Sequence, residues 1–456
     1  MEQINRDALF CDETEDYRCP SEADAGEVVT FYFRTEKNGA DAVVLLEYDP
    51  ETGALLQEWQ MKRLSWECCA GSVGNGADTN RGIDGGGMAD KSDSRFDYYS
   101  CALTLGTKTF SYVFQVTWGE NVCLYNRIGL TEDAAAHPFR LIPGFHVPEW
   151  SKGALMYQIY VDRFCNGDPT NDTETNEYIY LKKPVTRVMD WKEPISTLDV
   201  GRFYGGDLQG VLDKLDYLKS LKIEAIYLNP VFVSPSNHKY DCQDYDHIDP
   251  HYGVILEDAD GLVCPEDTDN DRAHKYMTRT ADEQNLEASD AFFARLIEEA
   301  HKRGIRVLVD GVFNHVGRDF FAFKDLQANR ENARYKDWFC DVNFWGNNEY
   351  NDGFSYGNWG GFNLLVKLNQ RNPEVQNYHY DTIRFWVDAF DIDGIRLDAA
   401  DVLDFDFMKG LRRLANEVKP EFWLMGEVIH GDYSRWANPE MLHSVTNYEL
   451  HKGLWS

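Results

Sequence analysis

The chain has 456 residues and a formal net charge of −32 at pH 7. This acidity opposes binding to nucleic acids, whose affinity for proteins comes largely from lysine and arginine, and it disfavours anionic membranes and acidic polymers. The same acidity leaves a neutral substrate or a cation as the natural partner. No run of about 18 apolar residues occurs, so we expect no membrane-spanning helix.

The first residues and the cysteines indicate the compartment. The segment MEQINRDALFCDETEDYRCP has neither the basic nor the apolar region of a secretory signal. The ten cysteines show no regular framework and no C-x-x-C pair, although Cys68 and Cys69 are adjacent. We therefore expect a reduced, cytoplasmic protein in preference to a disulfide scaffold. Aromatic residues make up 14% of the chain, which fits a large core and equally a carbohydrate ligand, because flat rings stack on sugar rings.

Residues 1–140 are predicted to form an antiparallel β-sandwich. The runs VVTFYFRT, AVVLLEY and FSYVFQV alternate or are rich in Val, Tyr and Phe, as half-buried strands are. The Gly- and Asp-rich stretch GSVGNGADTNRGIDGGG lies between them, and no long helical period is visible. Residues 141–150 follow as a linker with Pro143 and Pro148, which marks the predicted domain boundary.

From residue 151 to residue 456 the pattern changes to alternating strands and helices. Apolar strands such as ALMYQIYV, IEAIYLNP and FWLMGEV alternate with amphipathic helices such as DLQGVLDKLDYLKSLK and FMKGLRRLANEVK. Such units predict a parallel α/β sheet, either doubly wound or closed into a barrel. No G-x-G-x-x-G follows the first strand, so a dinucleotide-binding fold has no support. We expect six of the eight strands of a (β/α)8 barrel, near residues 155, 225, 307, 394, 423 and 444.

Polar residues follow the predicted strands at their C-terminal ends. In GIRLDAAD, Arg396 and Asp398 are two positions apart, so they point to the same face of the strand and would lie side by side. Taken alone, this pair is best interpreted as a salt bridge that caps the strand. In a parallel barrel, however, catalytic groups from several strands converge at this edge. The other polar residues expected at the edge are His238, Tyr240, Asp241, Asp310, Asn314, His315 and Glu427.

Two carboxylates on neighbouring strands of an acidic, aromatic protein indicate glycoside hydrolysis. Asp398 would attack the anomeric carbon, and Glu427 would donate a proton to the leaving oxygen. The two groups then need different pKa values. Arg396 would keep Asp398 ionised by direct charge pairing, whereas the apolar run FWLM before Glu427 would raise the pKa of that side chain.

One loop is rich in oxygen ligands. CNGDPTND holds four oxygen-bearing side chains within seven residues: Asn166, Asp168, Asn171 and Asp172. Because Ca²⁺ takes about six to eight oxygen ligands, a calcium site is one interpretation, and a polar turn rich in Asn and Asp is the other. The run DTDND at residues 267–271 also resembles a calcium loop, but Arg272 stands where such a loop needs glycine. We interpret that run as a solvated acidic insertion.

Taken together, these segments resemble the α-amylase family, glycoside hydrolase family 13. DGVFNH, GIRLDAAD and GEVIH match three of its short regions in order, and IEAIYLNP matches the motif of its second strand. LVKLN at residues 365–369 resembles a motif of the neopullulanase and cyclomaltodextrinase group. The resemblance covers about residues 150–455 and implies a TIM-type (β/α)8 barrel. Residues 1–140 are similar to the starch-binding sandwich that precedes the barrel in that group.

The resemblance also implies roles for individual residues. Asp398 would be the nucleophile of a retaining mechanism, Glu427 the acid/base, and Arg396 the group that orients Asp398. Without the motif, His315 would be interpreted as a core histidine bonded to a carbonyl. The residues that would contact or support the sugar at the point of cleavage are His238, Tyr240, Asp310, Asn314 and His315.

Three further expectations follow from the resemblance. A calcium ion would be held by residues 166–172 together with Gly205 and Asp207 of a GGD segment, and homodimers would form through the N-terminal domain. The family also uses a third carboxylate, an Asp after a His at the end of the seventh strand. The 29 residues after Glu427 contain no such pair. We therefore expect a fragment of a longer enzyme, or a natural truncation that hydrolyses glucans poorly on its own.

The predicted function is retaining hydrolysis of α-glucosidic bonds in maltodextrins, cyclodextrins or pullulan. Two alternatives stay open. One is a transglycosylase, in which a sugar instead of water attacks the intermediate, and the other is a non-catalytic glucan-binding protein. Turnover of maltotriose would separate the non-catalytic alternative from the two enzymes.

Overall fold

The chain forms two compact units, Met1–His146 and Val147–Ser456. Their boundary lies within the segment 141–150 that we predicted as a linker. The computed structural model describes residues 5–64, 95–133, 136–195 and 199–455.

Two sequence predictions fall on residues outside these ranges. They concern the glycine-rich stretch of the first unit and the adjacent pair Cys68 and Cys69. The eight described cysteines are free thiols. Within the described ranges, none of the helices combines the length and the apolar character that crossing a bilayer requires.

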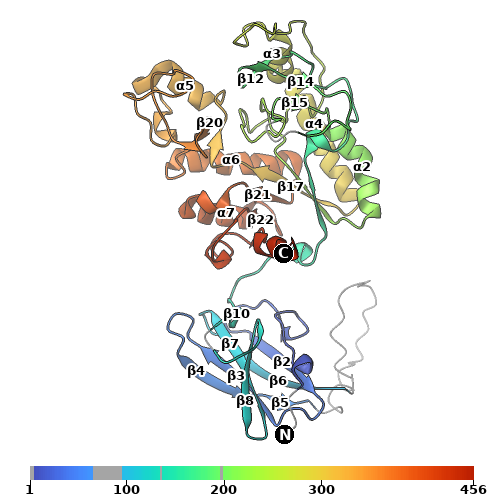
Figure 1. Ribbon diagram of the computed structural model, residues 1–456, viewed down its shortest axis with the longest axis vertical. Coiled ribbons are helices and arrows are strands. Elements are labelled where there is room, and N and C mark those ends of the chain that lie inside the picture. The colour runs from blue at the N-terminus through green and yellow to red at the C-terminus, as the bar shows by residue number, and fades with distance from the viewer. Residues whose placement is uncertain (1–4, 65–94, 134–135, 196–198, 456) are drawn as a thin grey trace. The chain divides into compact units, whose positions relative to one another are not determined.

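The first unit contains two antiparallel sheets (Figure 1). One has the order β1-β2-β6-β5, with the bounds Arg18–Cys19, Val28–Glu36, Phe96–Thr104 and Lys62–Arg63. The other has the order β4-β3-β7-β8-β9, with the bounds Leu55–Gln60, Ala42–Tyr48, Phe110–Trp118, Asn121–Asn126 and Gly129–Thr131. A further strand, β10 (Phe139–Leu141), pairs with β7.

Aromatic side chains join the two sheets of this unit. Along β2, fully buried positions alternate with less buried ones, because one face of the strand covers the other sheet. The rings of Phe31 and Tyr112 have their centroids 4.9 Å apart, and those of Phe33 and Phe114 are 4.7 Å apart. The predicted antiparallel sandwich is therefore observed.

Six parallel strands in chain order form the main sheet of the second unit. The order is β11-β16-β17-β21-β22-β23, and every neighbouring pair is parallel. The bounds are Met156–Ile159, Ala225–Leu228, Arg306–Gly311, Gly394–Leu397, Trp423–Gly426 and Ser444–Val445. A doubly wound sheet reverses its strand order at a switch point, so this sequential order favours the wall of a barrel. The six predicted strands are confirmed, and the count of eight stays a prediction.

Four of the described α-helices of this unit, α2, α4, α6 and α7, begin at capping side chains. Asp207 caps α2 by accepting the N–H of Gly210 at 2.6 Å, and Asp404 caps α7 by accepting the N–H of Asp406 at 2.9 Å. The α-helices are α2 (Leu208–Ser220), α3 (His274–Ala281), α4 (Glu283–Lys302), α5 (Phe321–Asn329), α6 (Pro373–Phe390), α7 (Phe405–Val418) and α8 (Tyr448–Trp455). Short 3-10 turns span Arg6–Ala8, Glu149–Ser151, Val161–Arg163, Arg330–Asn332, Lys336–Trp338, Ala400–Val402 and Tyr433–Arg435.

Two long connections carry short strands of their own. The connection between β11 and α2 contains β12 (Ile179–Tyr180), β13 (Lys183–Pro184), β14 (Thr186–Arg187) and β15 (Arg202–Phe203). The connection between β17 and α6 contains α5 and an antiparallel sheet of β18 (His315–Val316), β20 (Phe362–Lys367) and β19 (Asn358–Trp359).

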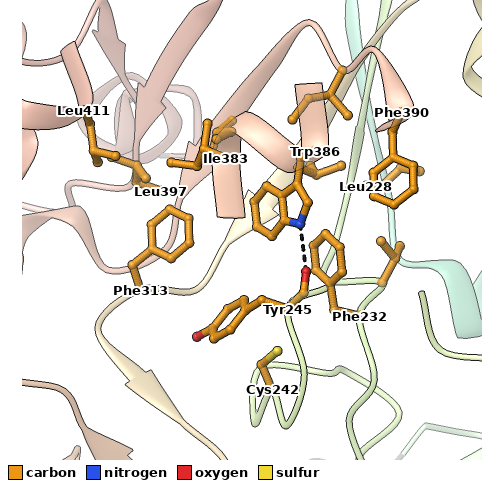
Figure 2. Close-up of a cluster of buried hydrophobic side chains, with 14 of the residues drawn as sticks. Leu228, Phe232, Cys242, Tyr245, Phe313, Ile383, Trp386, Phe390, Leu397 and Leu411 are labelled. Carbon is orange, nitrogen blue, oxygen red and sulfur yellow. Dashed lines mark hydrogen bonds between the residues drawn. The ribbon is translucent and has the colours of Figure 1, made fainter. Parts of the chain in front are cut away.

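Large side chains pack α6 against the sheet and its loops (Figure 2). The indole of Trp386 stacks on Phe232 with centroids 4.3 Å apart, and its N–H donates to the carbonyl of Tyr245 at 2.8 Å. Leu228 of β16 and Leu397 of β21 lie in the same buried cluster. Burying each such side chain stabilises the fold by about 1.5–3 kcal/mol. This packing fixes the carboxyl ends of the strands, where the candidate site lies.

Candidate active site

The register of the sheet brings three strand ends together. Asp310 of β17 lies opposite Arg396 of β21, which in turn lies opposite Met425 of β22. Asp398 and Glu427 each follow the end of their strand. Polar side chains far apart in the sequence therefore meet at the carboxyl edge of the sheet.

Arg396 is the centre of the site. Its Nη1 donates to Asp398 Oδ1 at 2.9 Å and to Asp310 Oδ1 at 3.0 Å, and its Nη2 lies 2.8 Å from Glu427 Oε2. The prediction that Arg396 and Asp398 lie side by side is thus confirmed. Because both candidate catalytic carboxylates contact one guanidinium, they lie on the same side of the sheet.

Asp310 is the most constrained of the three carboxylates. Its Oδ2 accepts hydroxyl groups from Tyr227 at 2.5 Å and from Tyr240 at 2.8 Å. Burial raises the pKa of Asp310, while Arg396 and the two hydroxyls act in the opposite direction. Asn229 donates to the hydroxyl of Tyr240 at 3.1 Å and so extends the network.

The two histidines of the site join the network through Tyr240. His315 Nε2 donates to the carbonyl of Tyr240 at 3.1 Å, and Asn314 Nδ2 donates to His315 Nδ1 at 3.2 Å. The N–H of Tyr240 donates to His238 Nδ1 at 3.1 Å. Burial lowers the pKa of His315 to about 4 and also lowers that of His238, so both rings are neutral at pH 7. The eight residues that the sequence analysis assigned to this site therefore form one connected set.

Glu427 has two further partners. Its Oε2 accepts the N–H of Ala399 at 3.2 Å, and its Oε1 accepts the hydroxyl of Tyr448 at 2.8 Å. Ala399 adopts a left-handed conformation with φ of 46°, which turns the chain sharply directly after Asp398. Burial raises the pKa of Tyr448 to about 12, so its hydroxyl stays protonated and donates.

Four side chains of the site were missed by sequence reasoning. Tyr227 and Asn229 are two positions apart, so strand alternation alone could have placed both on the face that reaches Asp310 and Tyr240. Trp359 stacks parallel to His315, with ring centroids 6.3 Å apart, and Tyr448 belongs to α8. The sequence carries no local signal for these last two, because the fold alone brings them to the site.

Arg396 favours the ionised form of Asp398, as expected, but burial outweighs its effect on the pKa of that side chain. Burial, reinforced by the carboxylate of Asp310, raises the pKa of Asp398 from 3.8 to about 7. Arg396 opposes this rise, but it divides its guanidinium among three carboxylates. The sequence showed one partner for Arg396, whereas the sheet supplies three.

This raised pKa predicts a pH-dependent stability difference between the wild-type chain and Asp398→Asn. Well below pH 3.8 the carboxyl group is protonated in the folded and the unfolded chain, so it costs nothing. As the pH rises from 3.8 to about 7 the folded wild type loses stability, and the rise in pKa corresponds to at most about 4 kcal/mol. We therefore expect Asp398→Asn to melt at a higher temperature than the wild type at pH 8 and with a smaller advantage at pH 4. An advantage that stays the same at both pH values would contradict the raised pKa.

A large cavity is lined by segments that follow the two candidate catalytic residues in the chain. It has a volume of about 1000 Å³, and its lining includes Asp401, which follows Asp398 by three positions, and His430, which follows Glu427 by three positions. Phe405 and Trp436 add apolar surface to its wall. A space of this size accommodates several sugar rings, since ligand pockets commonly measure about 300–1000 Å³.

The predicted calcium loop folds back on the start of α2, but in a different way from the expected one. Asp207 accepts the N–H groups of Asp168 at 2.7 Å and of Gly167 at 3.1 Å, in addition to capping the helix. The loop therefore contacts Asp207 through backbone N–H groups, whereas the calcium prediction requires the side-chain oxygens of the loop to lie beside Asp207. The reason is that a residue at the helix N-cap lies among unsatisfied N–H groups, which a carboxylate accepts.

Asp172 of this loop has hydrogen-bond and ion-pair partners of its own. Its Oδ1 accepts Asn166 Nδ2 at 2.7 Å, and a Cβ atom at Gly205 would lie 2.2 Å from the same oxygen, so only glycine allows this approach. Arg187 forms an ion pair with Asp172. Among the described residues, Asn166 Oδ1 and Asn171 Oδ1 have no hydrogen-bond partner although they are buried.

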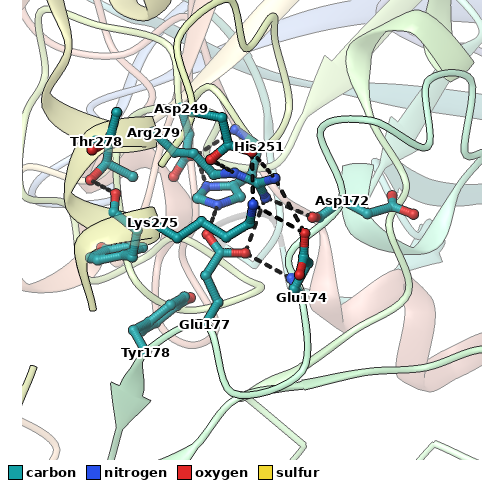
Figure 3. A network of polar contacts seen from close by, with 12 residues as sticks. Asp172, Glu174, Glu177, Tyr178, Asp249, His251, Lys275, Thr278 and Arg279 are labelled. Carbon is teal, nitrogen blue, oxygen red and sulfur yellow. Dashed lines mark hydrogen bonds and ion pairs between the residues drawn. The ribbon is translucent and has the colours of Figure 1, made fainter. Parts of the chain in front are cut away.

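A buried ionic network lies next to this loop (Figure 3). His251 donates from Nδ1 to Asp249 at 2.9 Å and from Nε2 to Glu177 at 2.7 Å. Burial opposes its charge, but the carboxylates of Glu177 and Asp249 raise its pKa to about 9. Arg279 donates to Glu177 at 3.1 Å and to the carbonyl of Asp172 at 3.0 Å, so the network also holds the calcium loop.

The same network supports the segment that carries His238 and Tyr240. Lys239, between them, has a φ of 58° and is buried, and its ammonium group donates to Asp249 at 2.5 Å. A lysine in this left-handed conformation is strained. Its buried ion pair keeps the turn in place, and with it the positions of the two neighbouring side chains.

The carboxyl edge of this parallel sheet thus gathers three carboxylates around one arginine, and glycoside hydrolysis is a chemistry that uses paired carboxylates. The chain belongs to the alpha-amylase family, whose catalytic domain matches residues 158–268 and 287–456.

Several known proteins are similar to this chain. Neopullulanase 2 of Thermoactinomyces vulgaris is 36% identical over 371 residues, which are 78% of this chain and 54% of that protein. A cyclomaltodextrinase of Thermoanaerobacter pseudethanolicus is 35% identical over 79% of this chain and 55% of its own length. An intracellular maltogenic amylase of Bacillus subtilis is 33% identical over 77% and 52%. The chain thus spans about half the length of the curated relatives it matches.

Solved structures show the same likeness. A cyclomaltodextrinase superposes with a TM-score of 0.59 at 27% identity, over 98% of this chain and 64% of that one. The type III pullulan hydrolase from Thermococcus kodakarensis superposes with a TM-score of 0.59 at 25% identity, over 97% and 64%. These likenesses cover both units of the chain.

Proposed function

We propose that the chain carries the catalytic centre of a retaining α-glucan hydrolase with Asp398 as nucleophile and Glu427 as acid/base. The observation that supports this assignment best is the contact of both carboxylates with Arg396, at 2.9 Å and 2.8 Å. In a retaining enzyme the two carboxyl groups lie about 5–5.5 Å apart, close enough for one cation to contact both. The barrel then has the (β/α)8 form, of which the six parallel strands are a part.

The proposed reaction has two steps. Asp398 attacks the anomeric carbon while Glu427 protonates the glycosidic oxygen, so the glycosidic bond breaks and a glycosyl ester forms. Glu427, now ionised, takes a proton from water, and the resulting hydroxide opens the ester with a second inversion. Arg396 stabilises the carboxylate form of Asp398 before the attack and after the release.

The other polar residues hold the reacting groups in place. Asp310 and Tyr240 fix Arg396 and the turn around it through the hydrogen bonds described above. His315 and His238, both neutral, are suited to hydrogen bonds with sugar hydroxyls, because they bring no charge that must be desolvated. The cavity of about 1000 Å³ is the proposed place for the part of the glucan beyond the cleaved bond.

The substrates that we propose are maltodextrins, cyclodextrins and pullulan. The names of the similar proteins are those of enzymes for such glucans. Residues 365–369, the segment that resembles a motif of that group, include the last residues of β20, where Lys367 pairs with His315. The cytoplasmic location and the homodimer through the N-terminal unit stay predictions.

A substrate panel tests the proposed function. We expect the chain to release reducing sugar slowly from maltotriose, γ-cyclodextrin or pullulan, as the absence of the third carboxylate predicts, and to give products that are initially in the α configuration when followed by proton NMR. Cellotriose, with β-bonds, is the matched control. Initial β-products would rule out Asp398 as nucleophile. New, longer oligosaccharides at high maltotriose concentration would show that transfer to sugars competes with hydrolysis.

We also propose that the loop of residues 166–172 binds Ca²⁺ and thereby ties the first connection to α2. The buried oxygens of Asn166 and Asn171 and the carboxylate of Asp172 are the side-chain donors that fit this ion. Asp207 is already used by backbone N–H groups, so it would hold the loop and not the metal. The ion would serve the structure and take no part in the reaction.

Calcium dependence of the melting temperature tests this site. Removal of calcium by EDTA should lower the melting temperature and calcium should restore it, since a ligand at a hundred times its Kd stabilises a fold by about 2.7 kcal/mol. Asn171→Leu should abolish the response. Asp269→Ala, in the acidic run that we interpret as a solvated insertion, should keep it. A melting temperature that is indifferent to both EDTA and calcium would reject the site.

A further inference from the structure

A row of hydrogen bonds runs from the first strand of the main sheet to Asp310. Gln158 of β11 lies opposite Tyr227 of β16 in the register, so the two side chains point to the same face. Gln158 Nε2 donates to Asn229 Oδ1 at 2.9 Å, and Asn229 Nδ2 donates to the hydroxyl of Tyr240 at 3.1 Å. That hydroxyl donates to Asp310 Oδ2 at 2.8 Å. We call Gln158, Asn229 and Tyr240 the donor row, and the proposed reaction gives its first two members no role.

The direction of the donor row is set from its inner end. As a carboxylate, Asp310 has no proton to give, so the hydroxyl proton of Tyr240 points to Asp310. The hydroxyl oxygen of Tyr240 then accepts, and within the Asn229 amide only the NH2 group can donate to it. This turns Asn229 Oδ1 toward Gln158, whose own NH2 group donates to it. Every donor of the row therefore points toward the carboxylate, and hydrogen bonds arranged in this way strengthen one another.

Asp310 depends on these donors because it is buried. Its oxygens are held by Arg396 at 3.0 Å and by the hydroxyl groups of Tyr227 and Tyr240. A buried carboxylate that loses one of its donors is left with uncompensated charge. Arg396 also contacts both candidate catalytic carboxylates. A change in the hydrogen bonds of Asp310 therefore acts on the one guanidinium that holds the reacting groups.

We propose that Asn229 is a positioning residue for the proposed reaction, because it directs the hydroxyl proton of Tyr240 to Asp310 and thereby keeps Arg396 in place. Gln158 supports it by fixing the orientation of the Asn229 amide from the outer end of the donor row. The inference rests on the proposed function, which supplies the nucleophile and the acid/base that Arg396 holds. It assigns to Asn229 an effect on the rate of the reaction and none on the binding of the glucan.

Two substitutions of Asn229 test the donor row, with fluoride release from α-maltosyl fluoride as the measurement. Asn229→Asp should lower kcat about 10²-fold, because the new carboxylate competes with Asp310 for the proton of Tyr240 and small displacements of catalytic groups have effects of this size. Asn229→Leu should lower kcat only about tenfold, because it removes a neutral hydrogen bond and offers no competing acceptor. KM should stay nearly unchanged in both variants, since the row acts through Arg396.

The order of these two variants separates positioning from packing. Aspartate has the shape of asparagine and leucine has not, so a packing role alone would make Asn229→Asp the milder change. In a Tyr240→Phe chain there is no hydroxyl proton to direct, so adding Asn229→Asp should lower kcat by only about twofold. The matched control is Asn285→Asp, the same change at a buried asparagine of α4 that accepts the N–H of Leu256 at 2.6 Å. A carboxylate can accept that hydrogen bond too, and this variant should retain kcat.

Gln158 allows the direction of the donor row to be tested without a change in the core, because its side chain is exposed. Gln158→Glu offers an acceptor to the NH2 group of Asn229, which turns Asn229 Oδ1 toward Tyr240 and away from its native donor. Gln158→Ala removes the same donor but offers no acceptor. We expect kcat to be about threefold to tenfold lower in Gln158→Glu than in Gln158→Ala. This pair decides the matter in case Asn229→Asp fails to fold.

The outcomes separate this inference from the proposed function. A loss in Asn229→Asp that is equal to or smaller than the loss in Asn229→Leu would overturn the positioning role alone, and so would equal rates of Gln158→Glu and Gln158→Ala. Losses of Asn229→Asp and Tyr240→Phe that multiply in the double variant would also overturn it. A wild-type chain that releases no fluoride would overturn the proposed function and the positioning role with it.

Discussion

Replacing Asp398 by asparagine is expected to lower kcat for maltotriose by on the order of 10⁴-fold or more. An amide nitrogen or oxygen is a far weaker nucleophile than a carboxylate, and it cannot form the glycosyl ester on which the two-step reaction depends. The geometry of the site should survive, because asparagine can still accept the hydrogen bond that Arg396 donates at 2.9 Å. Steady-state rates with maltotriose, measured against the reducing sugar released, give the result.

The control for this variant is Asp391→Asn, the same change at the amino end of the same strand. Asp391 lies just before β21, outside the cluster around Arg396, and it pairs with Lys419 at 2.6 Å. Its φ of 60° is one that asparagine also adopts. We expect this variant to retain nearly the full rate. An Asp398→Asn chain within tenfold of the wild type would show that another group is the nucleophile.

Replacing Glu427 by glutamine is expected to lower kcat for maltotriose by about 10²–10⁴-fold, the usual contribution of a positioned acid/base. The loss should depend on the leaving group. α-Maltosyl fluoride needs no proton for its departure, so the glycosyl ester should still form quickly and then accumulate, because no base activates water. Azide, a nucleophile that needs no base, should restore turnover and give maltosyl azide.

The surface residue Glu440 supplies the matched control, since Glu440→Gln makes the same change at an exposed position that pairs with Lys409. That variant should behave as the wild type with both substrates. A rate of glycosyl-ester formation that falls equally for maltotriose and for the fluoride in Glu427→Gln would argue against an acid role. Turnover unaffected by azide would argue against the base role.

The local sequence pattern was sufficient to place the strands of the second unit and the pair at the end of β21. Apolar runs alternating with amphipathic helices predicted six parallel strands, and the sheet has these six in chain order. The period of two in a strand predicted that Arg396 and Asp398 lie together, and they are 2.9 Å apart. Such features depend on neighbouring residues alone. The sequence therefore determined where the candidate carboxylates stand in the chain, and the short regions it contains determined the family.

The tertiary structure decided which groups surround those carboxylates. Asp310 and Glu427 reach Arg396 from other strands, and Tyr448 reaches Glu427 from α8. These contacts join residues 21 to 86 positions apart in the chain, so no local period predicts them. Burial, together with the carboxylates of Asp310 and Glu427, raises the pKa of Asp398 to about 7. The one partner evident in the sequence, Arg396, had suggested a lowered pKa.

The calcium loop shows the same division. Its composition, rich in Asn and Asp, was evident in the sequence, but the fold placed Asp207 at the start of α2, where backbone N–H groups claim its carboxylate. Composition determines which ligands are available, whereas the direction of each oxygen depends on the hydrogen bonds that the folded chain offers it. The sequence by itself thus determined the family, the strands and the identity of the candidate groups. Only the tertiary structure decided their partners, their protonation and their orientation, because those are set by atoms that are close in space and distant along the chain.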